Sequence, residues 1–224
     1  MVSVVGRTLG RMVEAVELDG WVEQLAGVAV ATTDTMLRET GLVQPPTVHL
    51  LSGELDPPYV GYLTCRPFYR GADAEVAVAG LGVLPAALRA SRLVVTWENA
   101  DLCTALQLPG DDGFLPGVVV LDATRDGHVL RWHPMRMHLA PAAGGSTATV
   151  DPEWGPVQHV RNGELSGPVS RLLAVWRAER DWPEVEVIGT CAALESAGYQ
   201  MRWISRHVTE SAPSWVRLLA PMMQ

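Results

Sequence analysis

Lysine is absent from this sequence of 224 residues, in which all 17 basic side chains are arginine. A P-loop, a Schiff-base or pyridoxal enzyme and a protein kinase each need a lysine in the site, so none of these mechanisms is encoded. Composition constrains function loosely, and the replacement of lysine by arginine is better explained by a GC-rich bacterial genome than by selection at a site.

Cysteine is also scarce, and long apolar runs are missing. Cys65, Cys103 and Cys191 are far apart and form no C-x-x-C pair, so they predict neither a disulfide framework nor a zinc site, and we expect reduced structural thiols. No uninterrupted apolar run approaches the roughly 18 residues of a membrane span. Arg7 and Glu14 interrupt the stretch where a signal peptide would be apolar. We therefore expect a cytoplasmic protein with no membrane contact.

The charge balance argues against nucleic acid as a partner. The formal net charge is −8, whereas a duplex-binding protein needs a basic stripe that neutralises several phosphates. The basic stretch near the C-terminus is sparse, consisting of Arg202, Arg206, His207 and Arg217. A protein partner or a homo-oligomer is the expected kind of assembly.

Hydrophobic periodicity predicts helices in the first forty residues and alternating strands and helices after them. The helical segments are 9–16, 21–25 and a short one near 33–37, and the strands are 47–51, a segment starting at 59, 92–97 and 117–121. Asp126-Gly127 predicts a hairpin turn after residue 122. Because a helix between two strands typically makes a crossover between parallel neighbours, the pattern predicts an α/β fold with a mixed, partly parallel sheet of about five strands flanked by helices.

The C-terminal region is predicted to be mostly helical. Residues 1–139 form the α/β core with its N-terminal helical segment, the small uncharged stretch 140–150 is a flexible linker or loop, and residues 151–224 pack on the same core as a single domain. The segment 185–189 fits either a strand or a helix. The apolar block at 215–219 is too short to be a stable helix alone and is expected to dock on its own sheet, with a second subunit as the alternative acceptor.

One acidic arrangement is a candidate metal site. Glu98 and Asp101 follow the strand 92–97, and Asp122 ends the next strand. If the two strands are parallel neighbours, the carboxylates share the crevice at the C-terminal edge of the sheet, where Mg²⁺ or Mn²⁺ finds the oxygen ligands it prefers. Helix capping and turn formation explain the same residues at least as well. Arg66 and Arg70 are candidate contacts for an anionic ligand at that edge, with solvated loop arginines as the simpler interpretation.

Two functional hypotheses remain. No G-x-S-x-G elbow and no complete dinucleotide fingerprint occur in the sequence. The first hypothesis is therefore a protein that acts through association, with itself or with another protein, and that needs no cofactor. Tryptophan and arginine, which are enriched in interfaces, accumulate toward the C-terminus, and Trp203, Trp215 and Arg217 are the candidate interface residues. The alternative is a metal-dependent hydrolase or phosphotransferase that uses the three carboxylates.

Overall fold

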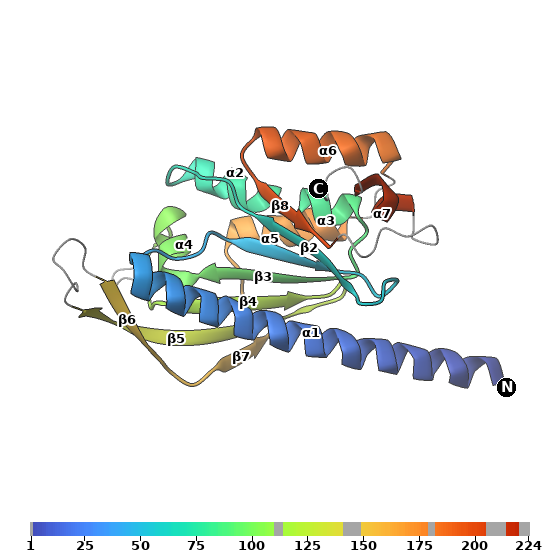
Figure 1. The fold of residues 1–224 in the computed structure, drawn as a ribbon, viewed down its shortest axis with the longest axis horizontal. Helices are drawn as coiled ribbons and strands as arrows, with labels where there is room; N and C mark the ends of the chain where they lie inside the picture. The colour runs from blue at the N-terminus through green and yellow to red at the C-terminus, as the bar shows by residue number, and fades with distance from the viewer. Residues whose placement is uncertain (1, 110–113, 141–148, 179–181, 205–213, 220–224) are drawn as a thin grey trace.

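The centre of the structure, a computed structural model that describes residues 2–109, 114–140, 149–178, 182–204 and 214–219, is an eight-stranded sheet (Figure 1). Its strands are β1 (Thr47–Leu51), β2 (Tyr59–Thr64), β3 (Arg92–Glu98), β4 (Gly117–Ala123), β5 (His128–Ala140), β6 (Thr149–Trp154), β7 (Gln158–Arg161) and β8 (Gln200–Trp203). They lie in the order β6-β5-β4-β3-β1-β2-β8, with β7 paired to β5. The long strand β5 pairs with β7 through residues 129–132 and with β6 through residues 135–140.

Every pair of neighbouring strands is antiparallel, so the predicted partly parallel sheet of about five strands is wrong. The helix α4 (Asn99–Ala105) joins β3 to β4 and has seven residues, which span about 10 Å. The connection returns to the end of the sheet where β3 finishes, with Glu98 opposite Val118, so β4 runs back beside β3.

One long helix, α1 (Val2–Thr40), replaces the three predicted N-terminal helical segments. From Leu18 onward its buried side chains pack on one face of the sheet, where they meet Leu51 of β1, Val94 of β3 and Val118 of β4. Figure 1 shows α1 crossing this face on the side opposite to the other helices. We call this face of the sheet the α1 face.

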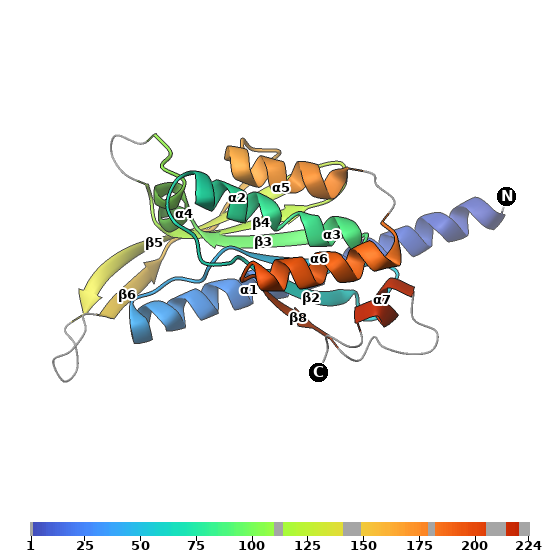
Figure 2. The ribbon, with the colours of Figure 1, turned by 90° about the horizontal axis from the view of Figure 1, so that it is seen from above.

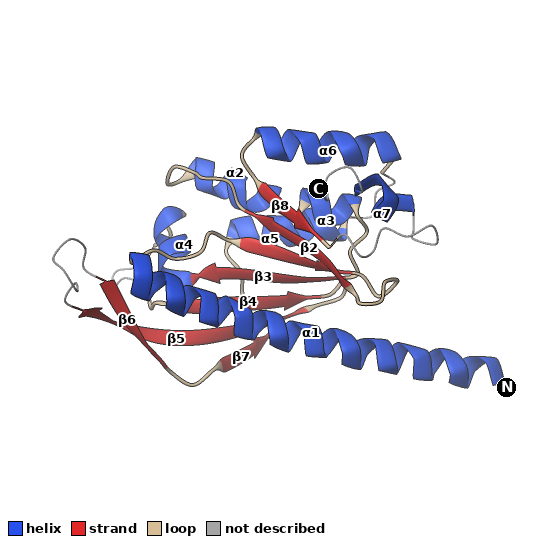
Figure 3. Cartoon of the chain, viewed as in Figure 1, coloured by secondary structure: helices blue, strands red, loops and turns tan. Residues whose placement is uncertain are grey.

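The remaining helices cover the opposite face, which we call the helical face. They are α2 (Ala72–Gly80), α3 (Val83–Ala87), α4, α5 (Gly167–Arg177) and α6 (Glu184–Ser196), and their blue ribbons lie together on one side of the sheet in Figure 3. The larger hydrophobic core lies beneath them. Trp176 of α5 is fully buried there and donates a hydrogen bond from Nε1 to the carbonyl oxygen of Ala90 at 3.0 Å.

The region after residue 150 is less helical than predicted, because it contributes β6, β7 and β8 to the sheet. Its strands have only four to six residues, so their pattern is weak in the sequence. Residues 185–189 belong to helix α6. Of the predicted linker 140–150, residue 140 ends β5 and residues 149 and 150 begin β6, whereas residues 141–148 lie outside the described part of the chain.

The last described element, α7 (Ser214–Leu219), contacts α6. Its Val216 is buried, so this described part of the C-terminal apolar block docks on its own chain, where α7 lies against α6. Seen from above in Figure 2, α7 lies beside α6. None of the described helices combines the length and apolar character that a membrane crossing requires.

Candidate functional site

The three carboxylates of the predicted metal site lie apart. In the β3–β4 register Asp122 is opposite Val94 and Glu98 is opposite Val118, so both acidic residues are on the α1 face but four positions apart, about 13 Å along the strands. The crevice that would gather them exists only where neighbouring strands are parallel. Within the described residues, no group of three or more His, Cys, Asp or Glu side chains is placed to hold a metal ion.

Glu98 and Asp101 form the N-terminal cap of α4. The buried Glu98 carboxylate accepts hydrogen bonds from the backbone N–H of Asp101 at 2.6 Å and from the backbone N–H of Gly117 at 2.7 Å. It thereby satisfies the first turn of the helix and joins it to the start of β4. The cap is therefore Glu98, directly before Asn99, the first residue of the helix. Asp101 itself is exposed.

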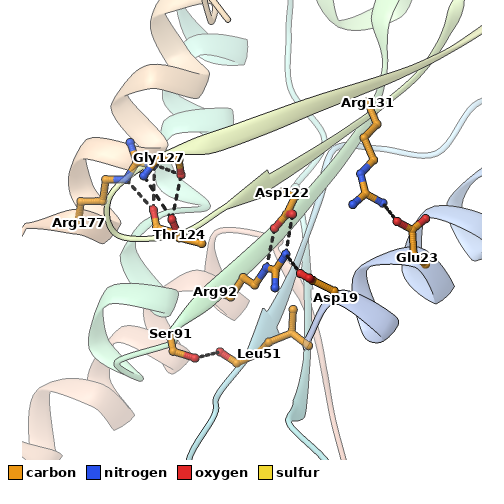
Figure 4. A network of polar contacts seen from close by, with 10 residues as sticks. All are labelled: Asp19, Glu23, Leu51, Ser91, Arg92, Asp122, Thr124, Gly127, Arg131 and Arg177. Atoms are coloured by element: carbon orange, nitrogen blue, oxygen red, sulfur yellow. Dashed lines mark hydrogen bonds and ion pairs between the residues drawn. The ribbon is translucent and has the colours of Figure 1, made fainter. Parts of the chain in front are cut away.

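Asp122 belongs to an ion-pair network that attaches α1 to the sheet (Figure 4). Arg92 donates from Nε and Nη2 to the two carboxylate oxygens of Asp122, each at 2.7 Å, and from Nη2 to Asp19 of α1 at 2.7 Å. A second pair, Arg131 of β5 with Glu23 of α1 at 2.7 Å, lies along the same face. These contacts make Asp122 part of the packing of α1 on the sheet.

The other predicted site residues are dispersed. Arg66 forms an ion pair with Asp73 at the start of α2, and its guanidinium lowers the pKa of that carboxyl. Arg70 is exposed. Trp203 is partly buried and packs against the main core, whereas Arg217 is exposed on α7. The side chain of Trp215 lies outside the described residues.

An apolar groove on the helical face is the principal open feature of the described structure. A cavity of about 320 Å³ crosses β4, β5 and β7 and is lined by Asn99, Phe114, Leu115, Val119, Leu130, Trp132, Gln158 and Val160. It shares Asn99, Val119 and Leu130 with a cavity of about 380 Å³ between α4 and the start of α5. It shares Leu115 and Trp132 with a cavity of about 510 Å³ at the junction of β6 and β7. We call these three adjoining cavities the β7 groove.

The groove exists because the layer of helices stops short of the last strands. Buried core positions on the helical face include Val119 and Leu121 of β4, but β5 adds only the partly buried Leu130 and Trp132 at the margin. Beyond them Val160 of β7 is 51% exposed, and Leu115 is 66% exposed. A contiguous apolar surface of this kind is typical of a site where another molecule binds.

Trp132 forms the wall between two of the three cavities. Its indole Nε1 packs against Gly117, where an added Cβ would collide with Nε1 and with the carbonyl oxygen of His133. The absence of a side chain at Gly117 therefore allows the indole to lie flat against β4. This contact fixes the shape of the groove floor.

The described lining of the groove is mostly apolar. Cys103 donates a hydrogen bond from Sγ to Asn99 Oδ1 at 3.7 Å, and burial raises the pKa of this thiol, so it is a poor nucleophile. The charged residues lining the groove are Arg136, Glu153 and Glu164. Among the described residues, no histidine lines the three cavities as a base for this thiol. This composition suits the binding of an apolar segment.

Comparisons of the chain with protein-family profiles, curated proteins and solved structures give no match. The function therefore has to be argued from the groove and from the surfaces around it.

Sequence reasoning missed the groove because its lining comes from segments between residues 97 and 166 that only the fold brings together. One signal was available in the alternation of β5, where Leu130 and Trp132 share a face and Arg131 points to the other. The structure leaves Trp132 half-buried at the edge of the core.

Proposed function

We propose that this protein acts by binding another protein, and that an extended segment of the partner adds a strand to the edge of β7 and places its apolar side chains in the β7 groove. The observation that carries the proposal is the juxtaposition of an open apolar groove with an edge strand. Strand addition obtains affinity from backbone hydrogen bonds and specificity from pockets for alternate side chains. The groove and the edge of β7 offer both.

The edge of β7 lies beside the groove, where a partner strand can reach both. Among the described strands β7 pairs only with β5, so its outer backbone groups are unpaired. The neighbouring edge strand β6 carries Asp151, Pro152 and Glu153, residue types that discourage edge pairing. Toward the groove β7 presents the uncharged Gln158 and Val160, which follow Trp132 and Leu130 in register.

The choice of a protein segment over a small ligand rests on the length and openness of the groove. It runs from Ser166 at the start of α5 to Pro156 between β6 and β7. Sites for small molecules enclose most of the ligand surface, whereas this groove is open along β7, where Val160 is half exposed. An extended chain fills such a groove while its backbone pairs with the strand beside it.

The test compares three proteins as affinity baits in a lysate of the source organism: the wild type, Val160→Arg and Val76→Arg. Val76 lies on α2 and is 65% exposed, and it lines none of the three cavities, so it is a matched control. We expect a protein that the wild type and Val76→Arg retain and that Val160→Arg loses at least about tenfold, a change of about 1.4 kcal/mol.

Hydrogen exchange on the purified complex then examines the mode of binding. Strand addition predicts that the amides of 158–161 become protected when the captured protein is added. Retention by the Val160→Arg variant equal to that of the wild type contradicts the proposal. Protection confined to another part of the chain contradicts it as well.

A further inference from the structure

The two sides of β7 differ in chemistry. Gln158 and Val160 line the β7 groove, and the alternation of a strand places His159 and Arg161 on the α1 face. All four side chains are exposed. A segment that adds a strand beside β7 alternates in the same way. Its side chains therefore meet an apolar groove on one side of the sheet and basic residues on the other.

The basic residues of β7 continue onto β5. His159 is directly opposite Arg131, which binds Glu23 of α1 at 2.7 Å and so fixes the side of the sheet that both residues occupy (Figure 4). His133 lies two residues further along β5 on the same face, opposite Val118 of the α1-face core. Burial and the positive charges of Arg131 and His159 lower the pKa of His133, which places the three groups in one region of positive potential. We call His159, Arg161, Arg131 and His133 the basic strip.

A carboxylate of the protein itself already occupies the inner part of the basic strip. Glu23 forms its ion pair with Arg131, whose side chain is 12% exposed. Within the described part of the chain, no carboxylate pairs with His159 or Arg161 at the outer part of the strip. The strip therefore accepts acidic groups, and its two exposed residues beside the free edge are available for those of a partner.

The pairing of β7 with β5 shows which backbone groups of β7 are open. Asn162 donates a hydrogen bond from its backbone N–H to the carbonyl oxygen of His128 at 2.9 Å. Because successive N–H groups of a strand point to opposite edges, the amides of the two groove-facing residues also point toward β5, and those of His159 and Arg161 point to the free edge. An added strand thus pairs its backbone with the two residues that carry the basic side chains.

We infer that the partner segment alternates acidic and apolar residues, with its apolar side chains in the β7 groove and its carboxylates opposite His159 and Arg161. The inference rests on the proposed function and names the chemistry of the partner. Opposite charges on directly opposed residues of neighbouring strands stabilise their pairing, and like charges destabilise it. The four residues of β7 offer an edge of about 13 Å. Two apolar and two acidic side chains of the partner match this edge.

The overall charge of the protein makes this local chemistry selective. The formal net charge of the chain is −8, so the molecule as a whole repels an acidic segment and attracts a basic one. The basic strip reverses this preference at the edge of β7. Charges around an interface select the correct partner and reject wrong ones more than they add affinity. An acidic segment is thereby directed to the strip and away from other surfaces.

Fluorescence anisotropy with labelled synthetic peptides tests the inference. The first peptide, twice as long as β7, alternates valine with glutamate, and the second alternates valine with arginine. The third has the composition of the first but holds its valines and its glutamates in two separate blocks, which controls for simple attraction between charges. We expect the wild type to bind the first peptide at least about tenfold more tightly than either of the others, because only the first places apolar and acidic residues on the correct sides.

Variants of the basic strip examine the same preference from the side of the protein. In His159→Glu/Arg161→Glu the preference should reverse in favour of the arginine peptide, and the circular dichroism should match that of the wild type because both side chains are exposed. The control Arg202→Glu changes an exposed arginine of β8, the edge strand at the other end of the sheet, and should keep the wild-type preference.

The possible failures of this inference and of the proposed function are distinguishable. Equal binding of the glutamate and arginine peptides to the wild type, lost in Val160→Arg, overturns the acidic pattern and leaves the groove as the binding site. A wild type that binds the block peptide as tightly as the alternating one overturns the pattern, as does a wild type that binds none of the peptides. The proposed function is decided separately by the lysate experiment, in which Val160→Arg loses the captured protein whatever the charge of its bound segment.

Discussion

Replacing Arg92 by leucine removes the cation that joins three parts of the structure. Its side chain is 11% exposed and that of Asp122 is 7% exposed, and the two are held by a pair of hydrogen bonds at 2.7 Å. Removing one partner of a buried pair leaves the other charge without compensation, which costs about 3 to 5 kcal/mol. The contact to Asp19, which is 64% exposed, adds at most about 1 kcal/mol. We therefore expect Arg92→Leu to lower the free energy of unfolding by about 3 to 5 kcal/mol.

The matched variants separate the charge effect from the packing effect. Asp122→Leu should cost less than Arg92→Leu, because Arg92 keeps Asp19 as a partner. The double variant Arg92→Leu/Asp122→Leu should recover most of the loss, since apolar residues often replace a buried ion pair at little cost. Urea unfolding followed by tryptophan fluorescence measures all three. A loss below about 1 kcal/mol for Arg92→Leu, or a double variant whose loss equals the sum of the single losses, refutes the reasoning.

The same titrations discriminate an ion pair from a metal site at Asp122. A ligand that binds only the folded chain raises the free energy of unfolding as its concentration exceeds the dissociation constant. Because the Asp122 carboxylate is already held by Arg92, millimolar magnesium should leave the wild-type urea midpoint unchanged. A midpoint that rises with magnesium in the wild type and not in Asp122→Leu would show that this carboxylate binds the ion.

Three further predictions concern packing and pH. Gly82→Ala should lower the free energy of unfolding by about 2 kcal/mol, because its Cβ would meet the carbonyl oxygen of Leu172. Gly27→Ala, at an exposed position of α1, should raise the free energy of unfolding by about 0.5 to 1 kcal/mol. Urea titrations in which both variants shift the free energy in the same direction contradict this pair of predictions. Burial lowers the pKa of His49 to about 4, so between about pH 6.5 and pH 4 the unfolded chain binds a proton that the folded chain does not. Stability is lost as the pH falls through this window, by on the order of 3 kcal/mol, and His49→Gln should reduce that loss; an unchanged pH profile of the urea midpoint would exclude it. Truncation after residue 210 should lower the melting temperature measured by calorimetry by about 4 °C or more, because it removes the buried Val216 from its contact with α6. An unchanged melting temperature would contradict the docking of α7 on α6.

Local elements of this fold are readable from the sequence, and their pairing is not. The apolar run at β3 and the turn at Asp126-Gly127 were predicted correctly, because strand propensity and turn chemistry depend on neighbouring residues. The direction of β4 beside β3 depends instead on where the connection 99–116 ends. That connection is longer than the dozen or so residues that a parallel crossover needs, so its length allows either direction, and the cap that joins Glu98 to Gly117 is a contact that only the fold reveals.

The candidate site was less accessible to sequence reasoning. Glu98 and Asp122 are conspicuous in the sequence because each follows an apolar run, yet each is used within the fold, one by a helix cap and the other by Arg92. The lining of the β7 groove is inconspicuous in the sequence, because Leu130 and Val160 look like ordinary strand residues. What makes them a candidate site is that the helices stop short of them, which is a property of the assembled layers.

The pairing of β2 with β8 has a consequence for the order in which the chain folds. Residues 61–64 of β2 can pair with β8 only after residues 200–203, the last of the described strands, have left the ribosome. Strands β3, β4 and β5 follow one another along the chain and can pair as soon as they emerge. Until synthesis passes residue 203, the nascent sheet has an unpaired edge at β2 bearing Val60 and Leu63, both buried in the finished protein. An unpaired apolar edge is a template for aggregation. Fragments that end before β8 should therefore aggregate during synthesis, and the last strand completes the sheet by closing that edge.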